Sequence, residues 1–317
     1  MTIQSGKERI TSVINRSVDR LSRTNYRLAR AYYRHRLKSL DRQFPQAPLI
    51  VYQMGKVGSS TVVKSLHEAG LRRRIYHVHF LTPELIEKYE IRRRKYLRTE
   101  RSGDLRHIWQ YKHLRDRLLN EKCEERWKVI TLVRDPVARN LATFFEHISV
   151  VSEAEDEWKL ESAEYEFCIK VRKSDLLPLV DLFFEKCRHD NPSIYFDREF
   201  KPVLGIDLYD EEFPSAEGYK IYQTDSFDIL LLRLENLNTV AEPALKRFLG
   251  LEEFALVNAN IGEEKDYADV YDKFKNQIRL PTHYLDRMYT SKFTRHFYTD
   301  EEIAVFRKRW TARADDD

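Results

Sequence analysis

The chain has 317 residues, of which 42% are hydrophobic and 12% aromatic, so it can bury a sizeable core and is not expected to be disordered. Its formal net charge is +4, from 55 basic and 51 acidic side chains, an excess too small to predict a nucleic-acid partner. No apolar run approaches the roughly 18–20 residues of a membrane span, so we expect no transmembrane segment.

The cysteines bear on the cellular compartment. Cys123, Cys168 and Cys187 are widely spaced and form no CxxC pair. This usage is typical of a reducing compartment, so we expect a cytoplasmic protein with no structural metal site.

The first predicted element is a basic helix within residues 8–42, rich in arginine. We assign residues 1–46 to a basic helical extension and residues 47–317 to the main domain. A helix docked on the core, a partner-binding helix, a helix in peripheral contact with a membrane surface and an Arg-rich targeting peptide all remain open. The apolar residues at helical spacing are Ile10, Val13, Ile14, Val18 and Leu21.

Strand and helix patterns then alternate along the chain. Strands with helices between them and short links predict an α/β fold, with a central parallel sheet covered by helices on both faces. The predicted strands are 48–53, 73–81 and 127–133, and the predicted helices are 59–70, 82–97, 103–122 and 135–148.

The C-terminal half gives a less regular pattern, and most of residues 150–200 predict no clear element. A strand pair is expected, followed by a helix. The helix is expected to end at Gly250, because glycine commonly follows the last turn of a helix. The tail, 262–311, is predicted to be mostly helical. The elements are a helix at 174–187, strands at 217–224 and 228–237, and a helix at 239–251.

The turn "QMGKVGSST" (53–61) joins the first strand to the first helix. Its glycines allow the backbone to curl, and the first N–H groups of the helix lack intrahelical partners. Together with the helix dipole these groups favour an oxyanion, and Lys56 adds a full positive charge. The candidate binding residues are Gly55, Lys56, Val57, Gly58, Ser59, Ser60 and Thr61.

The position of the lysine separates this turn from the common nucleotide-binding loop. The Walker-A pattern needs lysine directly after the second glycine, followed by a Ser or Thr for Mg²⁺. Here Gly58 is followed by Ser59, and Lys56 comes earlier. Phosphate binding without a metal is therefore favoured, and a P-loop kinase or nucleotide hydrolase is the alternative.

A second basic element follows the third strand, in "WKVITLVRDPVARNLATFF" (127–145). Arg134 lies at the carboxyl end of that strand, where ligands bind in open α/β sheets. The turn at 53–61 would lie at the same edge of the sheet. Two separated anion sites predict a ligand with two phosphate-like ends.

These segments carry a family resemblance over roughly residues 48–250. "QMGKVGSST" resembles the 5′-phosphosulfate loop of sulfotransferases that use 3′-phosphoadenosine 5′-phosphosulfate (PAPS), especially the carbohydrate sulfotransferases. "VRDPVARNLATF" resembles their 3′-phosphate element, and "LLLRLENL" (230–237) their late strand. The tail "YTSKFTRHFYTDEEI" (289–303) resembles that of bacterial sulfotransferase-like proteins linked with capsular polysaccharide synthesis.

The resemblance implies a P-loop-type sheet, PAPS as donor, no metal, and a carbohydrate acceptor. By it, Lys56 contacts the phosphosulfate, the hydroxyls at 59–61 cradle the 5′-phosphate, and Arg134 binds the 3′-phosphate. The family usually has a serine eight residues after this arginine, where this chain has Ala142. Asn140 and Thr143 are the neighbours that would compensate. A catalytically reduced nucleotide-binding protein is therefore a further alternative.

Sulfuryl transfer to a hydroxyl also needs a base, and "IYHVHFLT" offers His77 and His79. Two residues apart on a strand, they point to the same face. The 2-O-type uronyl sulfotransferases carry a similar pair, and His79 is the favoured base, with His77 second. A zinc site and a buried structural histidine are the alternatives.

Two ion pairs are also predicted from spacing. Arg139 is expected to pair with Asp135 on the surface of its helix, and a supporting role behind the binding residues is the alternative. Arg233 and Glu235 lie on one strand face and are expected to form a buried pair.

Overall fold

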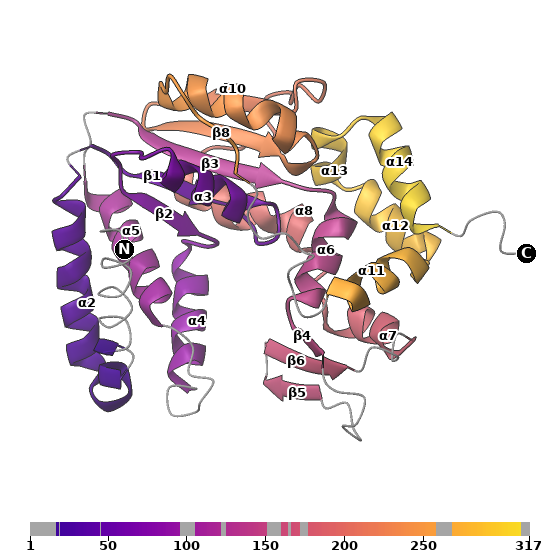
Figure 1. Ribbon diagram of the computed structural model, residues 1–317, viewed down its shortest axis with the longest axis horizontal. Helices are drawn as coiled ribbons and strands as arrows, with labels where there is room; N and C mark the ends of the chain where they lie inside the picture. The colour runs from indigo at the N-terminus through magenta and orange to yellow at the C-terminus, as the bar shows by residue number, and fades with distance from the viewer. Residues whose placement is uncertain are drawn as a thin grey trace, which may run out of the picture. The chain divides into compact units, whose positions relative to one another are not determined.

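The computed structural model describes most of the chain (Figure 1), and the chain divides into two compact units. The first unit comprises Met1–Tyr52, Arg72–Lys128 and Asp225–Phe227, and the second Gln53–Leu71, Val129–Thr224 and Asp228–Asp317. The described residues are 17–18, 20–44, 46–95, 105–121, 125–150, 160–163, 166–171, 177–257 and 268–311.

A five-stranded sheet has the strand order β2-β1-β3-β8-β7 and is mostly parallel, with helices flanking it. This confirms the predicted α/β fold. β1 and β2 run parallel, with Val51 opposite His77, whereas β7 and β8 are antiparallel. All four residues of β1 are buried, as expected of a strand covered on both faces. The strands are β1 (Leu49–Tyr52), β2 (Ile75–Val78), β3 (Trp127–Val133), β7 (Tyr219–Gln223) and β8 (Phe227–Arg233).

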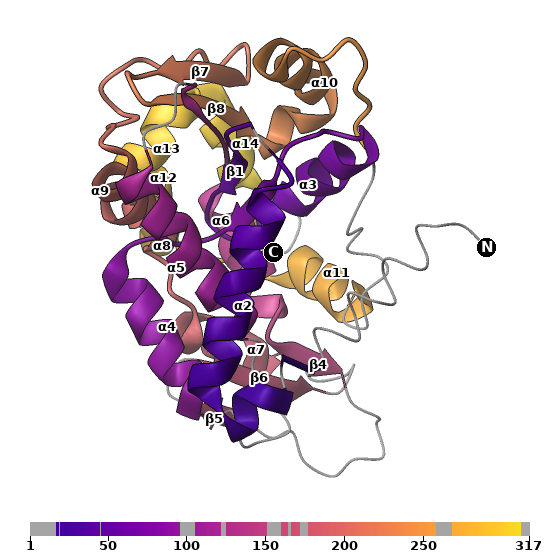
Figure 2. The same cartoon turned by 90° about the vertical axis from the view of Figure 1, so that its left-hand side faces the viewer.

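The described part of the first unit includes the helices α2, α4 and α5, and α5 packs beside both α2 and α4 (Figure 2). α2 is part of the predicted basic N-terminal helix. Asp41 at its end lies 2.6 Å from His113 Nε2 and accepts a 2.8 Å hydrogen bond from Tyr76. The described part of the N-terminal helix is therefore docked on a folded core. The helices are α2 (Tyr26–Asp41), α4 (Pro83–Lys95) and α5 (Leu105–Asn120).

The second unit holds most of the helices. α3 and α10 are each followed by a glycine with positive φ, Gly70 and Gly250, as predicted from these residues. The tail is helical, which is also as predicted. The helices are α3 (Ser59–Glu68), α6 (Pro136–Phe145), α7 (Leu177–Lys186), α8 (Asn191–Tyr195), the π-helical η1 (Phe196–Phe200), α9 (Lys201–Leu204), the 3₁₀ turn η2 (Leu234–Asn236), α10 (Leu237–Leu249), α11 (Ala268–Gln277), α12 (Thr282–Tyr289), α13 (Lys292–Phe297) and α14 (Asp300–Trp310).

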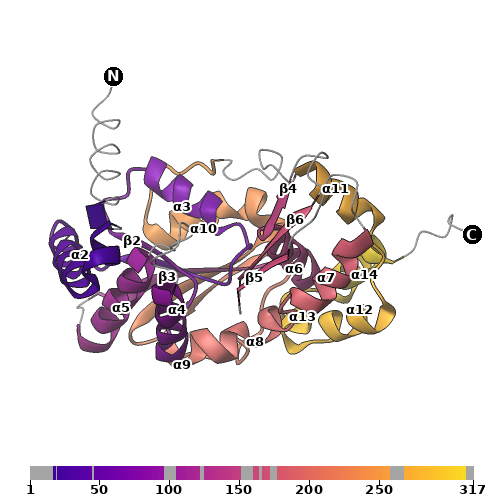
Figure 3. The same cartoon turned by 90° about the horizontal axis from the view of Figure 1, so that it is seen from below.

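A second, smaller sheet was not predicted. Its three strands have the order β4-β6-β5, with β4 parallel and β5 antiparallel to β6 (Figure 3). The helix predicted to run to Ile148 ends at Phe145, and Ile148 begins β4. Strands this short show too few repeats for their periodicity to be read. The strands are β4 (Ile148–Val150), β5 (Leu160–Ala163) and β6 (Glu166–Val171).

Two features of the described residues concern membranes and metals. None of the helices in those ranges combines the length and the apolar character that crossing a bilayer requires. In the same ranges, no group of three or more His, Cys, Asp or Glu side chains is arranged to hold a metal ion.

Candidate functional site

The turn between β1 and α3 has a backbone that alternates in the sign of φ. Lys56 has φ of 71° and Gly58 has φ of 86°, whereas Gly55 and Val57 are not in the positive region. Lys56 is the single non-glycine residue with positive φ in the described part of the chain. Alternation of this kind turns successive N–H groups toward one side and forms an anion-binding concavity.

Three N–H groups of this loop are unengaged by the described residues; Gly58 and Ser60 have exposed surface, whereas Val57 is buried. Among the described residues, none accepts a hydrogen bond from the backbone N–H of Val57, Gly58 or Ser60. Thr61 N donates to Gly58 O at 3.1 Å, which closes the first turn of α3. The unengaged donors therefore lie where the helix dipole contributes partial positive charge.

Two arginines hold the carbonyl groups of the loop. Arg134 Nη1 donates to Lys56 O at 3.1 Å, and Arg139 Nε donates to Gly55 O at 3.1 Å. In a trans peptide the C=O and the following N–H point in opposite directions. Fixing the Lys56 carbonyl toward Arg134 therefore directs the N–H of Val57 to the opposite side.

Sequence reasoning gave Arg139 a supporting role only as an alternative, and it missed Glu146. The predicted surface pair of Arg139 with Asp135 is wrong, because Arg139 is buried and its guanidinium binds the loop and the Asn140 side chain. Glu146, the residue that ends α6, forms an ion pair with the Lys56 ammonium. The second arginine of "RDPVAR" was a readable signal for Arg139, whereas no local signal marks Glu146.

The hydroxyl residues at the start of α3 differ in exposure. Ser59 is buried, and its Oγ accepts a 2.7 Å hydrogen bond from Gln53 Nε2. Ser60 is exposed and Thr61 half-buried. Ser59 thus ties the helix start to the end of β1, and Ser60 is the hydroxyl of the three that is most open to a ligand.

Asn140 and Thr143 lie on α6, where Asn140 is fully buried. The Asn140 amide donates to His189 O at 3.0 Å, and its side-chain oxygen accepts from Arg139. Thr143 Oγ1 donates to the Arg139 carbonyl at 2.9 Å. The structure therefore places Asn140 inside the core that supports Arg139.

Asp135 caps α6 with a buried carboxylate. Its Oδ1 accepts from Val137 N and from the Tyr289 hydroxyl, each at 3.0 Å, while Oδ2 is buried without a hydrogen-bond partner. Its own N–H donates to Glu235 Oε1 at 2.8 Å. Burial, and then the nearby Glu235 charge, raise the pKa of Asp135 to about 6. C-terminal helices thus hold the residue that follows Arg134.

Arg233 lies at the end of β8 and is buried. The predicted pair with Glu235 is wrong. Arg233 pairs with Glu302 and donates to Phe297 O at 2.9 Å, while Glu235 accepts from Asp135 N and from the Tyr298 hydroxyl.

The two candidate histidines lie in the first unit. Their ring centroids are 5.1 Å apart in an edge-to-face arrangement, and His79 is exposed. Burial, followed by the charges of His79 and His107, lowers the pKa of His77 to about 4. The loop leaves β1 at Tyr52, whose partner in β2 is Val78, the residue before His79.

Comparison with known proteins yields one finding. The family model NKWYS, described as "Putative capsular polysaccharide synthesis protein", matches residues 168–299, less than half of the chain. The matched range contains Glu235, Tyr289 and Tyr298 but neither the loop nor Arg134. Comparisons with curated proteins and with solved structures find no match. The match links the chain with capsular polysaccharide synthesis.

Proposed function

We propose that this protein is a sulfotransferase that moves a sulfuryl group from PAPS to a hydroxyl of a polysaccharide. The observation that carries the proposal is the loop of alternating φ at the start of α3, with unengaged N–H groups and Lys56 beside them. The link with capsular polysaccharide synthesis supports a carbohydrate acceptor. The proposal includes a P-loop-type sheet and the nucleotide site that such a sheet implies.

The residues present suit such a donor. The loop N–H groups and Ser60 would hold the 5′-phosphosulfate, and Lys56 would neutralise charge that develops on the bridging oxygen. Arg134, partly exposed beside the loop, would bind the 3′-phosphate.

The proposed step is an in-line transfer, with PAPS supplying the sulfuryl group when bound. The acceptor oxygen forms a bond to sulfur while the bond from sulfur to the 5′-phosphate oxygen breaks. The acceptor proton passes to His79, and adenosine 3′,5′-bisphosphate leaves. His79 is favoured over His77, because an imidazole with a pKa near 4 is a poor proton acceptor at neutral pH.

Thermal-shift titration with adenosine 3′,5′-bisphosphate, beside ATP with Mg²⁺, tests the donor site. We expect the bisphosphate to stabilise the protein, and Lys56→Ala and Arg134→Ala to lose most of that effect. Lys64→Ala is the matched control, because Lys64 is exposed on α3 and faces Glu68. No shift with the bisphosphate would overturn the proposal. A larger shift with ATP and Mg²⁺ would overturn it in favour of the kinase or hydrolase alternative.

A transfer assay with radiolabelled PAPS and a polysaccharide acceptor tests the base. His79→Ala should retain bisphosphate binding and lose transfer by about 10²–10⁴-fold, the usual contribution of a general base. Transfer that survives in this variant would place the base elsewhere.

A further inference from the structure

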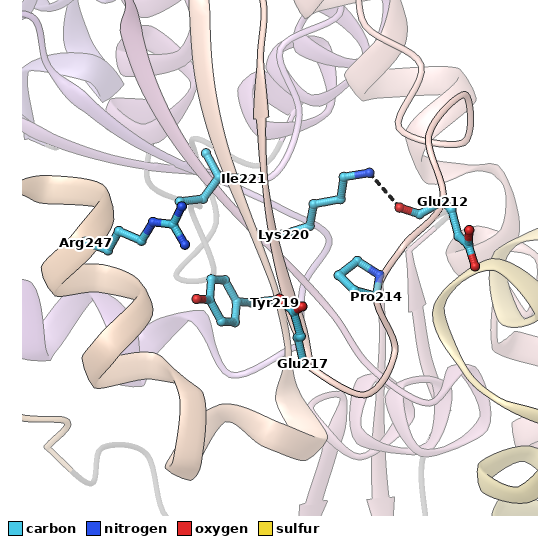
Figure 4. Close-up of a pocket in the computed structure, with 7 residues that line it drawn as sticks. All are labelled: Glu212, Pro214, Glu217, Tyr219, Lys220, Ile221 and Arg247. Carbon is cyan, nitrogen blue, oxygen red and sulfur yellow. Dashed lines mark hydrogen bonds between the residues drawn. The ribbon is translucent and has the colours of Figure 1, made fainter.

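A cavity of about 350 Å³ lies in the second unit, away from the loop, where α10 faces the edge strand β7. Tyr219 and Ile221 project from β7 toward Arg247 of α10, whereas Lys220 projects from the other face of the strand toward Glu212 (Figure 4). This alternation follows from the two-residue period of a strand. The cavity is large enough for a small ligand, and no residue of the 53–61 loop lines it.

The polar groups on the α10 side of this cavity are exposed or half-buried and have no partner among the described residues. In the described ranges, no hydrogen bond or ion pair engages the Tyr219 hydroxyl, the Arg247 guanidinium or the Glu217 carboxylate. Lys220 differs, because it pairs with Glu211 at 3.0 Å and donates to Glu212 O at 2.6 Å. Unengaged polar groups around an apolar surface are the usual make-up of a ligand site.

The chemistry of these groups suits an acidic sugar. The ring of Tyr219 and the side chain of Ile221 offer an apolar surface for the face of a pyranose. Arg247 offers the planar donor pair that binds a carboxylate in bidentate fashion, and Glu217 can accept from sugar hydroxyls.

The start of α10 lies close to the loop. A Cβ placed on Gly58 would lie 2.5 Å from Leu234 Cδ1 and 3.6 Å from Leu237, the first residue of α10. Arg247 lies ten residues further along that helix, on the order of 15 Å away at 1.5 Å per residue. Several linked sugar units would cover this span.

We propose that the cavity is a subsite for an acidic sugar unit of the polysaccharide whose hydroxyl is sulfated at the loop; this inference rests on the proposed function. The subsite selects acceptors by charge and holds the polymer several units from the reacting hydroxyl.

Calorimetric binding of defined hexasaccharides to the full chain tests this subsite. The probes are an alternating glucuronate and N-acetylglucosamine hexamer, a mannuronate hexamer and neutral maltohexaose. We expect an acidic hexamer to bind more tightly than maltohexaose, and Arg247→Ala to weaken its binding about tenfold, as for the loss of a charged hydrogen-bond donor. Tyr219→Ala should also weaken binding, while Arg247→Lys should recover part of it.

Lys246→Ala is the matched control, because Lys246 is an exposed neighbour on α10 that does not line the cavity. Equal binding by the Arg247→Ala and Lys246→Ala variants, or no preference for either acidic hexamer, would overturn the subsite. Adenosine 3′,5′-bisphosphate binding should be unchanged in every variant. If an acidic hexamer binds through Arg247 but the bisphosphate does not bind, the proposed function fails and the subsite stands.

Discussion

Gly58 shows how closely the loop is packed at the scale of single residues. Its φ of 86° lies in the left-handed region, which is strained for a residue with a Cβ atom. Its α-carbon also faces Leu234. The glycine therefore meets two separate requirements, one of conformation and one of space. A substitution can separate them.

We predict that Gly58→Ala lowers the free energy of unfolding by about 2–4 kcal/mol, from left-handed strain plus overlap with Leu234. Gly70→Ala is the control, because Gly70 has φ of 66° but nothing lies within 4 Å of the added Cβ, so it should lose only about 1 kcal/mol. Urea denaturation measures both. Equal losses in the two variants would show that the contact with Leu234 does not matter, and Leu234→Ala should partly rescue Gly58→Ala.

Glu146 forms an ion pair with the Lys56 ammonium, which is the group that a ligand anion would need. The side chains are 22% exposed for Lys56 and 45% for Glu146, and ion pairs so near solvent are weak. We predict that Glu146→Gln binds adenosine 3′,5′-bisphosphate roughly two- to fivefold more tightly, because a competing carboxylate is removed.

Titration calorimetry measures this affinity, with Glu185→Gln as control, since Glu185 pairs with Lys186 on α7. Weaker binding by Glu146→Gln would instead mean that the carboxylate holds Lys56 in its productive position.

At the scale of elements, residues at both ends of α6 make contacts that support the candidate site. Asp135 at its start is held by Tyr289 of α12 and Glu235 of η2, and Glu146 at its end holds Lys56. Arg139 in its middle holds Gly55. The loop geometry therefore depends on one helix and on the C-terminal helices that pack against it.

The buried Asp135 carboxyl should make stability depend on pH. Its pKa is about 6 in the folded protein against an ordinary value of 3.8, so the folded state binds more protons between these values. Stability from the protonated form is thus present below pH 3.8 and is lost as pH rises through 6.

Between about pH 4 and pH 6 the wild type should lose on the order of 2–3 kcal/mol of its free energy of unfolding. We predict that the Asp135→Asn variant does not show this loss. Guanidinium denaturation of both proteins across this range measures it. A stability difference that does not change with pH would contradict the prediction.

The same elements show what the sequence could and could not predict. The β1–loop–α3 segment was readable, because its apolar run, glycines and helix-start residues act locally. The second arginine of "RDPVAR" marked Arg139 as a candidate, but spacing within α6 does not identify the residues that Arg139 and Glu146 contact, which lie 84 and 90 positions away. The β4-β6-β5 sheet was missed because its strands are too short for a periodic pattern.

At the scale of the whole molecule, the residues proposed to bind the donor all belong to one compact unit. The loop, Arg134 and Arg139 belong to the second unit, whereas His77 and His79 belong to the first. The proposed donor contacts are thus confined to the second unit.

This division predicts where a bound donor product slows amide hydrogen exchange. Adenosine 3′,5′-bisphosphate should protect peptides that cover 53–61 and 134–139, because their N–H groups and arginines would contact it. Peptides from α4 in the first unit should be unaffected, and Lys56→Ala should abolish the protection. Equal protection of α4 would show that the donor site is not confined to the second unit.

At Lys56, whose backbone is left-handed, the residue that would stabilise the fold differs from the one that the proposed function needs. For the fold alone, glycine would suit this position better, since a lysine there carries about 1–2 kcal/mol of strain. Lys56→Gly should therefore unfold at higher urea concentration than Lys56→Ala, although both lack the ammonium and both should lose most of the bisphosphate binding. Selection for a more stable chain would favour glycine at this position, and the proposed activity would then be lost. A thermostable variant of this protein should therefore first be checked for a change at Lys56 and for loss of bisphosphate binding.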